Sequence, residues 1–472
     1  MKKFHRVRTA AILLTAMALV MCASCRRDVL YSGSDAKVRF STDTVFFDTV
    51  FTTVGSITER LKIYNPYDEA LVLDMIWLER GESSNFKLNV DGFKGRAVSD
   101  VRIEPLDSIF VFIEVTVDPN GGNSPMVIEE KLRVETNGNT QSVTLVAWGQ
   151  DAYFFSSTRL RFSQPVSLFT DKPNVFYGYT LVDTNTTLVI PCGARVHFHA
   201  NSGLIVGHEA SLKILGCQDD PVIIQGDRLE DYFKDVPGQW GQIYLSATSK
   251  DNEIRNAIIK NGSLGVRVDS NINENPSLLL ENTIIANMSY IGLLGQGADI
   301  VATNCVFART GEYTVALAFG GNYQFTHCTF ANYWSENPRG KPTLYLNNYF
   351  EVNKKVYPRD FSAEFTNCII HGNLESELER EWDKGAKFDY TFDHVLIKLD
   401  TENIDLPNFV STIKATPEMT SSTLFANAPK DNYRPSEGSK LIDAGKDAGV
   451  PFDLEGKNRV GAPDLGAYEY SD

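Results

Sequence analysis

The chain has 472 residues, of which 60 are Asp or Glu and 45 are Lys or Arg, so its formal net charge is −15. This balance argues against nucleic acid as a partner, because phosphate binding needs a basic surface. The length exceeds what one hydrophobic core usually organises, which predicts two or more domains.

Residues 1–24 are predicted to be an export signal. Four basic residues precede an apolar run at 10–21, which is too short to span a bilayer. The run ends in "CASC", which resembles a bacterial lipoprotein signal with Cys25 as the lipidated residue; Cys22 stands where that signal usually has Leu. The resemblance implies a membrane partner through the lipid anchor, a tether at 25–35 and an outer-membrane location, periplasmic or surface. Simple secretion and an uncleaved anchor are the alternatives.

The segment 36–152 is predicted to form a β-sandwich. In "SIFVFIEVTVDPN", apolar residues at odd positions from 109 to 117 alternate with Phe110, Phe112, Glu114 and Thr116, as in a strand with one buried face. Asn137-Gly138, between two such runs, predicts a hairpin turn. About seven short strands favour an antiparallel sandwich. "FFDTVFTTVGSITERLKIYN" resembles the start of immunoglobulin-like modules of the ASH/MSP group, which implies an immunoglobulin-like fold.

Residues 153–184 are expected to be a linker with an N-terminal cap, and 185–470 a right-handed single-stranded parallel β-helix. A short phrase recurs there with steps of 26, 22, 23 and 40 residues, beginning at Asn256, Asn282, Asn304, His327 and Asn367. A period of 22 to 26 fits one coil, and equivalent residues of successive coils then lie about 4.8 Å apart. We expect the first residue of each phrase to form a ladder of side-chain hydrogen bonds. The whole chain is therefore predicted to be all-β.

The second residue of each phrase is small, and three times it is a cysteine: Cys305, Cys328 and Cys368. Ala257 and Thr283 fill the same slot in earlier coils, so we expect these thiols to be buried core residues. A zinc site needs four converging ligands, whereas stacked coils present one residue each in a line. A disulfide between adjacent coils and metal binding are the alternatives. The five cysteines after Cys25 do not suggest a disulfide scaffold, and whether Cys192 and Cys217 are also free stays open.

Two further stretches resemble one family. "HEASLKILGCQDDPVIIQGDRLEDYFKDVPGQWGQIYL" is similar to the opening coils of pectate-lyase-like β-helix lipoproteins of Bacteroidota, except that a Gly usual before the Ala is absent. The end of the chain, "SKLIDAGKDAGVPFDLEGKNRVGAPDLGAYEY", resembles their closing motif. The resemblance implies the β-helix fold from about residue 185 to 470 and makes Trp240 a packing residue.

Three residues are candidates for lyase chemistry: Lys260, Arg267 and Asp269. A lyase uses a basic residue to abstract a proton and carboxylates to hold Ca²⁺ against a uronate, so Ca²⁺ is expected only in that case and no other cofactor or metal is expected. Charged residues on solvated strands are the ordinary alternative. Of the motifs of polygalacturonase-type hydrolases, only the Asp pair at Asp219 occurs, in a turn before Pro221, which counts against such a hydrolase. His197 and His199 in "RVHFHA" are expected on the outward side of one strand, as surface histidines or, with His208, as a metal site.

The last step of the repeat is 17 residues longer than the usual 23, which places an insertion at about 333–360. Insertions in solenoids project as loops and are often binding sites. The insertion is aromatic and basic, and its candidate glycan contacts are Tyr333, Trp334, Arg339, Lys341, Tyr345 and Tyr349. A hairpin that packs its own aromatics is the alternative. The stretch "LESELEREWDKG" that follows has helical propensity.

These features favour an exported, lipid-anchored protein of the cell envelope that contacts a polysaccharide without cleaving it. The first alternative is a lyase acting on uronate-containing polymers. The second is a structural or adhesin-like scaffold, since the β-helix hosts all three functions. The ligand, the membrane face and the oligomeric state are not readable from the sequence.

Overall fold

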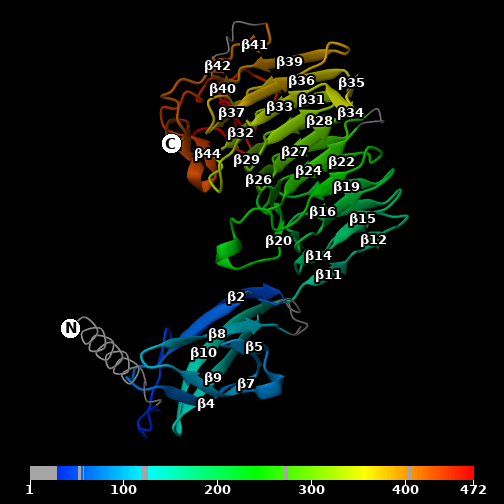
Figure 1. Cartoon of the computed structure of the whole chain (residues 1–472). Helices are drawn as coiled ribbons and strands as arrows, with labels where there is room; N and C mark the ends of the chain where they lie inside the picture. Colours follow the sequence, from blue (N-terminus) through cyan, green and yellow to red (C-terminus); the bar gives the residue numbers. More distant parts are fainter. Residues whose placement is uncertain are drawn as a thin grey trace, which may run out of the picture. The chain divides into compact units, whose positions relative to one another are not determined.

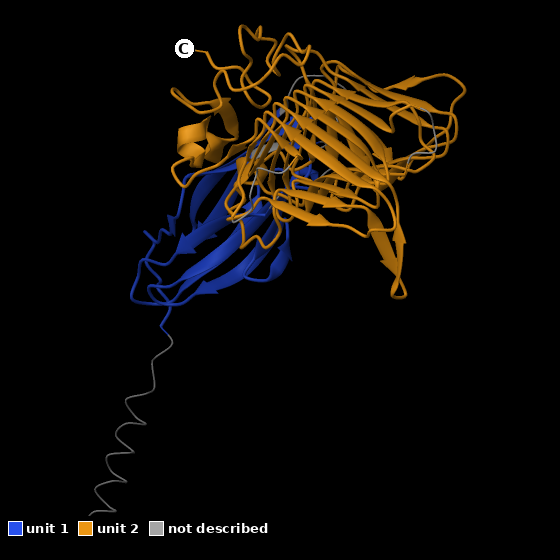
Figure 2. Ribbon diagram, turned by 90° about the horizontal axis from the view of Figure 1, so that it is seen from above, with its two compact units in different colours: residues 1–150 blue, residues 151–472 orange. Residues whose placement is uncertain are grey.

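The computed structural model describes residues 29–51, 55–56, 58–117, 126–270, 275–400 and 407–471. The chain forms two compact units, residues 1–150 and 151–472 (Figures 1 and 2). Cys25 and the predicted signal at 1–24 lie outside the described residues. In the described part of the chain, no helix has the length and apolar character needed to cross a membrane.

Unit 1 is a β-sandwich, in which two five-stranded sheets share one apolar core. In sheet order, the first sheet contains β1 (Arg39–Phe40), β3 (Glu59–Tyr64), β8 (Ser108–Val115), β5 (Phe86–Val90) and β6 (Phe93–Gly95). The second contains β2 (Thr44–Phe51), β10 (Asn139–Gln150), β9 (Met126–Thr136), β4 (Leu71–Leu78) and β7 (Ala97–Ile103). Ten strands form where about seven were expected, because edge strands as short as β1 and β6 show no alternating pattern.

The alternation in β8 is confirmed. Ile109, Val111, Ile113 and Val115 are buried, and the residues between them lie on the solvent side of the first sheet. The hairpin predicted at Asn137-Gly138 joins β9 to β10, and both residues have positive φ, 47° and 77°. A short 3₁₀ turn, η1 (Gly81–Ser83), precedes β5.

Unit 2 is a right-handed parallel β-helix whose three parallel sheets run along the stack of coils (Figure 1). The eleven-stranded sheet contains β11 (Tyr153–Ser156), β14 (Asn174–Tyr177), β17 (Arg195–Phe198), β20 (Val222–Gly226), β23 (Ala257–Lys260), β26 (Ile284–Met288), β29 (Val306–Thr310), β32 (Thr329–Asn332), β37 (Ile369–Gly372), β40 (Leu396–Ile397) and β42 (Ile413–Lys414).

The nine-stranded sheet contains β12 (Arg159–Leu160), β15 (Tyr179–Val182), β18 (Gly203–Val206), β21 (Ile243–Leu245), β24 (Leu264–Asp269), β27 (Ile291–Gln296), β30 (Val315–Ala318), β33 (Leu344–Asn347) and β38 (Leu378–Glu381). The ten-stranded sheet contains β13 (Val166–Ser167), β16 (Thr187–Pro191), β19 (Ser211–Leu215), β22 (Asn252–Arg255), β25 (Leu278–Glu281), β28 (Asp299–Thr303), β31 (Gly321–Thr326), β36 (Phe361–Thr366), β39 (Phe388–Asp393) and β41 (Phe409–Val410).

The segment 153–184, expected to be a linker and cap, instead belongs to the β-helix: it contains the first coil, with β11, β12 and β13, and the strands β14 and β15 of the second coil. Its strands β11, β12 and β13 pair in parallel with β14, β15 and β16 of the next coil. The strands are two to four residues long, and strands this short do not reveal a period in the sequence.

The predicted ladder lies at the turns between the ten-stranded and the eleven-stranded sheets. Its residues Asn256, Asn282, Asn304, His327 and Asn367 all have φ between 46° and 55°, a left-handed conformation that Asn tolerates better than most residues. His394, with φ 54°, adds a further rung. Side-chain bonds join Asn304 to Asn282 at 3.2 Å and Asn367 to His327 at 2.9 Å. The expected register is confirmed, and the hydrogen-bonded ladder is recorded at two of its four steps.

The three repeat cysteines are core residues, as predicted. Cys305, Cys328 and Cys368 are fully buried free thiols. Cys192 and Cys217, whose state was left open, form a disulfide with a Cα–Cα distance of 5.2 Å between the turns of adjacent coils. Trp240 is buried at 1% exposure and packs on Phe198, which confirms its packing role.

The C-terminal segment covers the outer face of the eleven-stranded sheet (Figure 1). It contains α2 (Ser421–Leu424), β43 (Phe425–Asn427), η3 (Ala428–Lys430) and β44 (Asn432–Pro435). Leu441, Leu465 and Tyr468 pack there on Ala308 and Ile369. The C-terminal stretch at 439–470, which resembles the closing motif of the family, therefore runs along the side of the stack of coils.

The insertion is a projecting hairpin, β34 (Tyr349–Val352) and β35 (Lys355–Pro358), between β33 and β36. Phe350 and Tyr357 stack on each other across it at 4.9 Å, as in the alternative of a self-packed hairpin. The expected helix in "LESELEREWDKG" is absent: residues 378–381 form β38, which pairs with β33, because pairing to the adjacent coil overrides helix propensity.

Candidate functional site

The outer face of the nine-stranded sheet carries aromatic and charged side chains, several of which are predicted site residues. One outward ladder runs from coil to coil through Tyr244, Arg267, Leu294, Ala316, Tyr345 and Glu379. Adjacent members are one strand spacing apart, about 4.8 Å. The stacking therefore places Arg267 and Tyr345 on one surface, three rungs apart.

At one end of this ladder, Arg267 is held by Asp269. Its Nε and Nη2 donate to the two carboxylate oxygens at 2.9 and 3.0 Å, and its guanidinium lies over the ring of Tyr244 at 4.8 Å. The Tyr244 hydroxyl donates to the same carboxylate at 2.8 Å. The hydrogen bonds that Arg267 donates to Asp269 raise the pKa of the guanidinium, so this side chain stays a cation.

At the other end, two stacked tyrosines are flanked by carboxylates. The rings of Tyr313 and Tyr345 are 4.9 Å apart, and their hydroxyls donate to Glu379 at 2.8 Å and to Glu381 at 2.7 Å. The hydroxyl of Tyr349, from the hairpin, also reaches Glu381, at 3.4 Å. Burial, and then the carboxylates, raise the pKa values of Tyr313, to about 12, and Tyr345, so both remain neutral donors.

Lys341 completes this end of the face. Its Nζ lies 3.5 Å from Glu379 and 5.4 Å from the centre of the Tyr313 ring. Between the two ends, an apolar strip of Leu264, Ile291 and Ala316 joins the polar groups. We call this surface, from Tyr244 to Tyr349, the tyrosine–carboxylate face.

Lys260 does not belong to this face. It lies on β23 of the eleven-stranded sheet, and its Nζ is 3.5 Å from the carbonyl oxygen of Lys234 in the covering loop that contains η2 (Asp231–Phe233). Burial lowers its pKa. The structure thus brings Arg267 and Asp269 together, and leaves Lys260 on another side of the β-helix.

Three of the six predicted glycan contacts are anchoring residues instead. Trp334 is only 4% exposed. The Tyr333 hydroxyl is 2.7 Å from Nδ1 of His371, and burial raises its pKa. Arg339 forms a buried ion pair with Glu377, at 2.7 and 2.9 Å. The prediction that these three side chains are exposed on a loop is therefore wrong. The chain before the hairpin folds inward and is bonded to His371 and Glu377 of the next coil.

The expectation for the histidines is also wrong for His197, which is buried at 4% exposure with Nδ1 2.9 Å from the carbonyl oxygen of Gly226. Burial lowers its pKa to about 4. His199 is half-buried, and the carboxylate absent from the sequence argument is Asp227, 2.7 Å from its Nδ1. His208 follows β18, at the end of another sheet. Among the described residues, no three His, Cys, Asp or Glu side chains converge as metal ligands.

Sequence reasoning missed Tyr313, Glu379, Glu381 and Trp382. Trp382 is 56% exposed and stacks on Phe388 at 5.7 Å. Extending the coil period to the nine-stranded sheet would have aligned Arg267 with Leu294 and Ala316. It would not have reached Tyr345, because the chain between β30 and β33 is longer than one regular step.

Comparisons of the sequence with family models and with curated proteins give no match. Among solved structures, the chain is similar to pectate lyase Pel9A, at 11% identity over 68% of this chain and 88% of that one, with a TM-score of 0.30. It is similar to the catalytic unit of a GH87 alpha-1,3-glucanase from Streptomyces thermodiastaticus, at 10% identity over 75% and 88%, with a TM-score of 0.27. The ASH/PapD-like domain of human CEP192 matches 27% of this chain over 95% of its own length, at 12% identity and a TM-score of 0.18. These scores are low, and the fold described above rests on the strand pairing of the chain itself.

Proposed function

We propose that this protein is an exported, lipid-anchored component of the cell envelope that binds glycan, without cleaving it, through the tyrosine–carboxylate face. The observation that carries the proposal is the stacked pair Tyr313 and Tyr345 with Glu379 and Glu381 beside it. Aromatic rings stack on the C–H faces of sugars, and carboxylates accept hydrogen bonds from sugar hydroxyls. Lys341 supplies a donor at the same place.

The proposed absence of cleavage is supported by the state of the two basic candidates. Arg267 donates two hydrogen bonds to the carboxylate of Asp269, from Nε and Nη2. Its guanidinium is therefore held as a cation and is poorly suited to accept a proton. Lys260 faces a different side of the β-helix. The export and lipid anchor are supported by the signal at 1–24 and by Cys25.

The test is binding of the mature chain to a broad panel of neutral and acidic glycans. Tyr345→Ala with Tyr349→Ala removes two rings of the face, and we expect affinity for any bound glycan to fall at least tenfold. Tyr232→Ala is the matched control, because Tyr232 is 77% exposed on the covering loop of another sheet. Phe substitutions at 345 and 349 separate the rings from their hydroxyls.

No binding to any glycan, or unchanged affinity in the double variant, would refute the proposal. The same samples are incubated with pectin, alginate and glycosaminoglycans in the presence of Ca²⁺. Unsaturated products that absorb ultraviolet light would replace the binding proposal by the lyase alternative, and Arg267→Lys would then be expected to abolish them.

A further inference from the structure

The first sheet of unit 1 has a second surface that combines aromatic rings with cations. One row of paired residues crosses four strands of its outer face: Arg60 on β3, Phe112 on β8, Asn89 on β5 and Lys94 on β6. The next rows add Lys62 opposite Phe110 and Lys87 opposite Glu114. The rings of Phe110 and Phe112 lie 5.9 Å apart and nearly parallel, at 21°.

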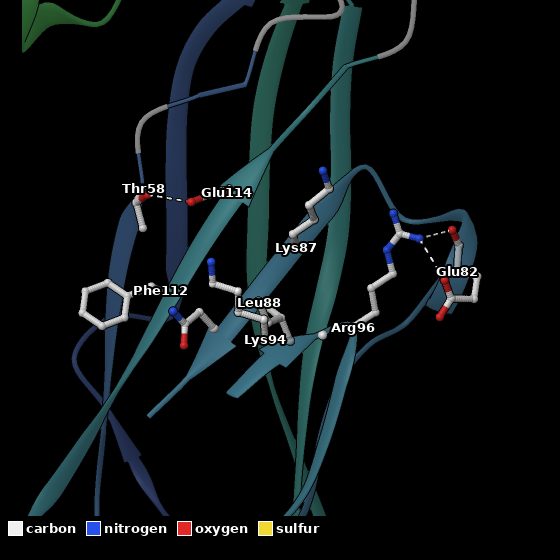
Figure 3. Close-up of a pocket in the computed structure, with 10 residues that line it drawn as sticks. Thr58, Glu82, Lys87, Leu88, Lys94, Arg96, Phe112 and Glu114 are labelled. Carbon is white, nitrogen blue, oxygen red and sulfur yellow. Dashed lines mark hydrogen bonds and ion pairs between the residues drawn. The ribbon is translucent and has the colours of Figure 1, made fainter. Parts of the chain in front are cut away.

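Part of this row lines a pocket of about 890 Å³. Figure 3 shows the ring of Phe112 and the ion pair of Arg96 with Glu82 on opposite sides of it, with Lys87 and Lys94 between them. The pocket lies over β8, β5 and β6, so its floor is a paired sheet.

The pocket has an excess of positive charge in a protein whose net charge is −15. Its two carboxylates are engaged, Glu82 with Arg96 and Glu114 with the hydroxyl of Thr58 at 3.0 Å. Among the described residues, Lys87, Lys94 and the neighbouring Arg60 have no ion-pair partner. With Arg60 included, this surface carries four cations and two carboxylates, a net charge of +2, which favours an anionic ligand.

Asn89 gives a second, independent indication. Its side-chain oxygen Oδ1 is buried in the pocket wall and has no hydrogen-bond donor. Buried acceptors are nearly always paired, and a turn of the Asn89 side chain toward the pocket would let this atom accept from a ligand hydroxyl. A hydroxyl group supplies one, whereas a phosphate or carboxylate offers only acceptors.

We propose that this pocket binds an anionic glycan. Lys87, Lys94 and Arg60 would contact its carboxylate or sulfate groups, the ring of Phe112 would lie against a sugar face, and Asn89 Oδ1 would accept a sugar hydroxyl. An anionic lipid surface would satisfy the positive charge of the pocket, but its head groups would not reach Asn89, which is recessed in the pocket wall. The inference is independent of the tyrosine–carboxylate face, because the two sites lie in different units.

The test uses the full mature chain, with polygalacturonate as a carboxylate probe, heparin as a sulfate probe and dextran as a neutral probe. We expect binding to at least one anionic probe, weakening as salt is raised, and no binding to dextran at this pocket. Lys87→Gln with Lys94→Gln should reduce the affinity roughly tenfold. Lys37→Gln with Lys131→Gln, the same charge change elsewhere in unit 1, should leave it unchanged.

Asn89→Ala separates a binding role from a structural one. Because Oδ1 has no partner in the free protein, the variant should keep its thermal stability and lose affinity for the anionic probe. Tyr345→Ala with Tyr349→Ala should leave this affinity intact, so failure of the β-helix proposal and failure of this one are distinguishable. The proposal would be overturned if the Lys87→Gln/Lys94→Gln and Lys37→Gln/Lys131→Gln variants bound the anionic probe with equal affinity, or if the protein bound no anionic probe at all. Lysine-dependent binding to phosphatidylglycerol vesicles without binding to either polysaccharide would replace it by a lipid surface.

Discussion

The buried ion pair of Arg339 and Glu377 predicts a large stability effect for Glu377→Gln. The two side chains are 2% and 0% exposed, and Glu377 also accepts hydrogen bonds from Thr343, through its backbone N–H and its hydroxyl, and from the N–H of Leu374. The substitution leaves a buried guanidinium without a counter-charge, which costs about 3–5 kcal/mol. The effect should appear in the unfolding of unit 2.

The matched control is the ion pair of Lys341 with Glu379, whose side chains are 46% and 29% exposed. Glu379→Gln should cost only about 0–1 kcal/mol, because water screens this pair. In a double-mutant cycle, Arg339→Met with Glu377→Gln should cost less than the sum of the single substitutions, since the isolated buried charge is removed.

Urea unfolding followed by circular dichroism gives the free energies, and limited proteolysis between residues 335 and 341 reports local opening of the segment. We expect Glu377→Gln to expose that segment to protease and Glu379→Gln to leave it protected. A cost below about 1 kcal/mol for Glu377→Gln, equal to that of an exposed pair, would refute the anchoring role and return Arg339 to the candidate glycan contacts.

Three further predictions concern the interior of the β-helix. Burial holds the pKa of His197 at about 4, against 6.5 for an exposed histidine, so the unfolded chain binds the extra proton and stability falls by about 3 kcal/mol as pH falls from 6.5 to 4; His197→Gln should flatten this slope in unfolding measured against pH. The three free cysteines of the repeat should resist alkylation in the native protein and react after denaturation, with mass spectrometry finding one disulfide, between Cys192 and Cys217; labelling of the native thiols would contradict their burial. Asn304→Ala should cost about 2–4 kcal/mol, because it strains a left-handed residue and removes the hydrogen bonds of Asn304 with Asn282 and Arg459. Asn304→Gly should cost less, since glycine removes the strain.

Much of the fold was readable because it repeats or alternates locally. The two-residue period of β8 assigns Ile113 to the core and Phe112 to the surface, which also exposes the pocket of unit 1. The coil period assigns Cys305, Cys328 and Cys368 to one buried line. In each case, the environment of a residue follows from its position in a regular pattern.

The insertion shows where the sequence was insufficient. Its composition indicated an aromatic and basic loop, but Trp334 and Arg339 turn inward while Tyr345 and Tyr349 turn outward. The difference comes from partners in the next coil: Glu377 holds Arg339, and Glu381 accepts from Tyr345 and Tyr349. A hairpin that leaves the coil path has no period from which these directions can be read.

The sequence by itself determined the all-β character, the sandwich followed by a β-helix, the coil register and the interior place of the repeat cysteines. These properties depend on hydrophobic alternation and on a fixed repeat length, both of which are local in the chain. Only the tertiary structure decided that Lys260 and Arg267 face different sides, that Cys192 bonds Cys217, and that Tyr313, Tyr345 and Glu381 share one face. Lys260 and Arg267 belong to one coil, but the turn between β23 and β24 places them on different sheets. The disulfide and the shared face join residues of different coils, and the stacking of coils sets their distances and directions.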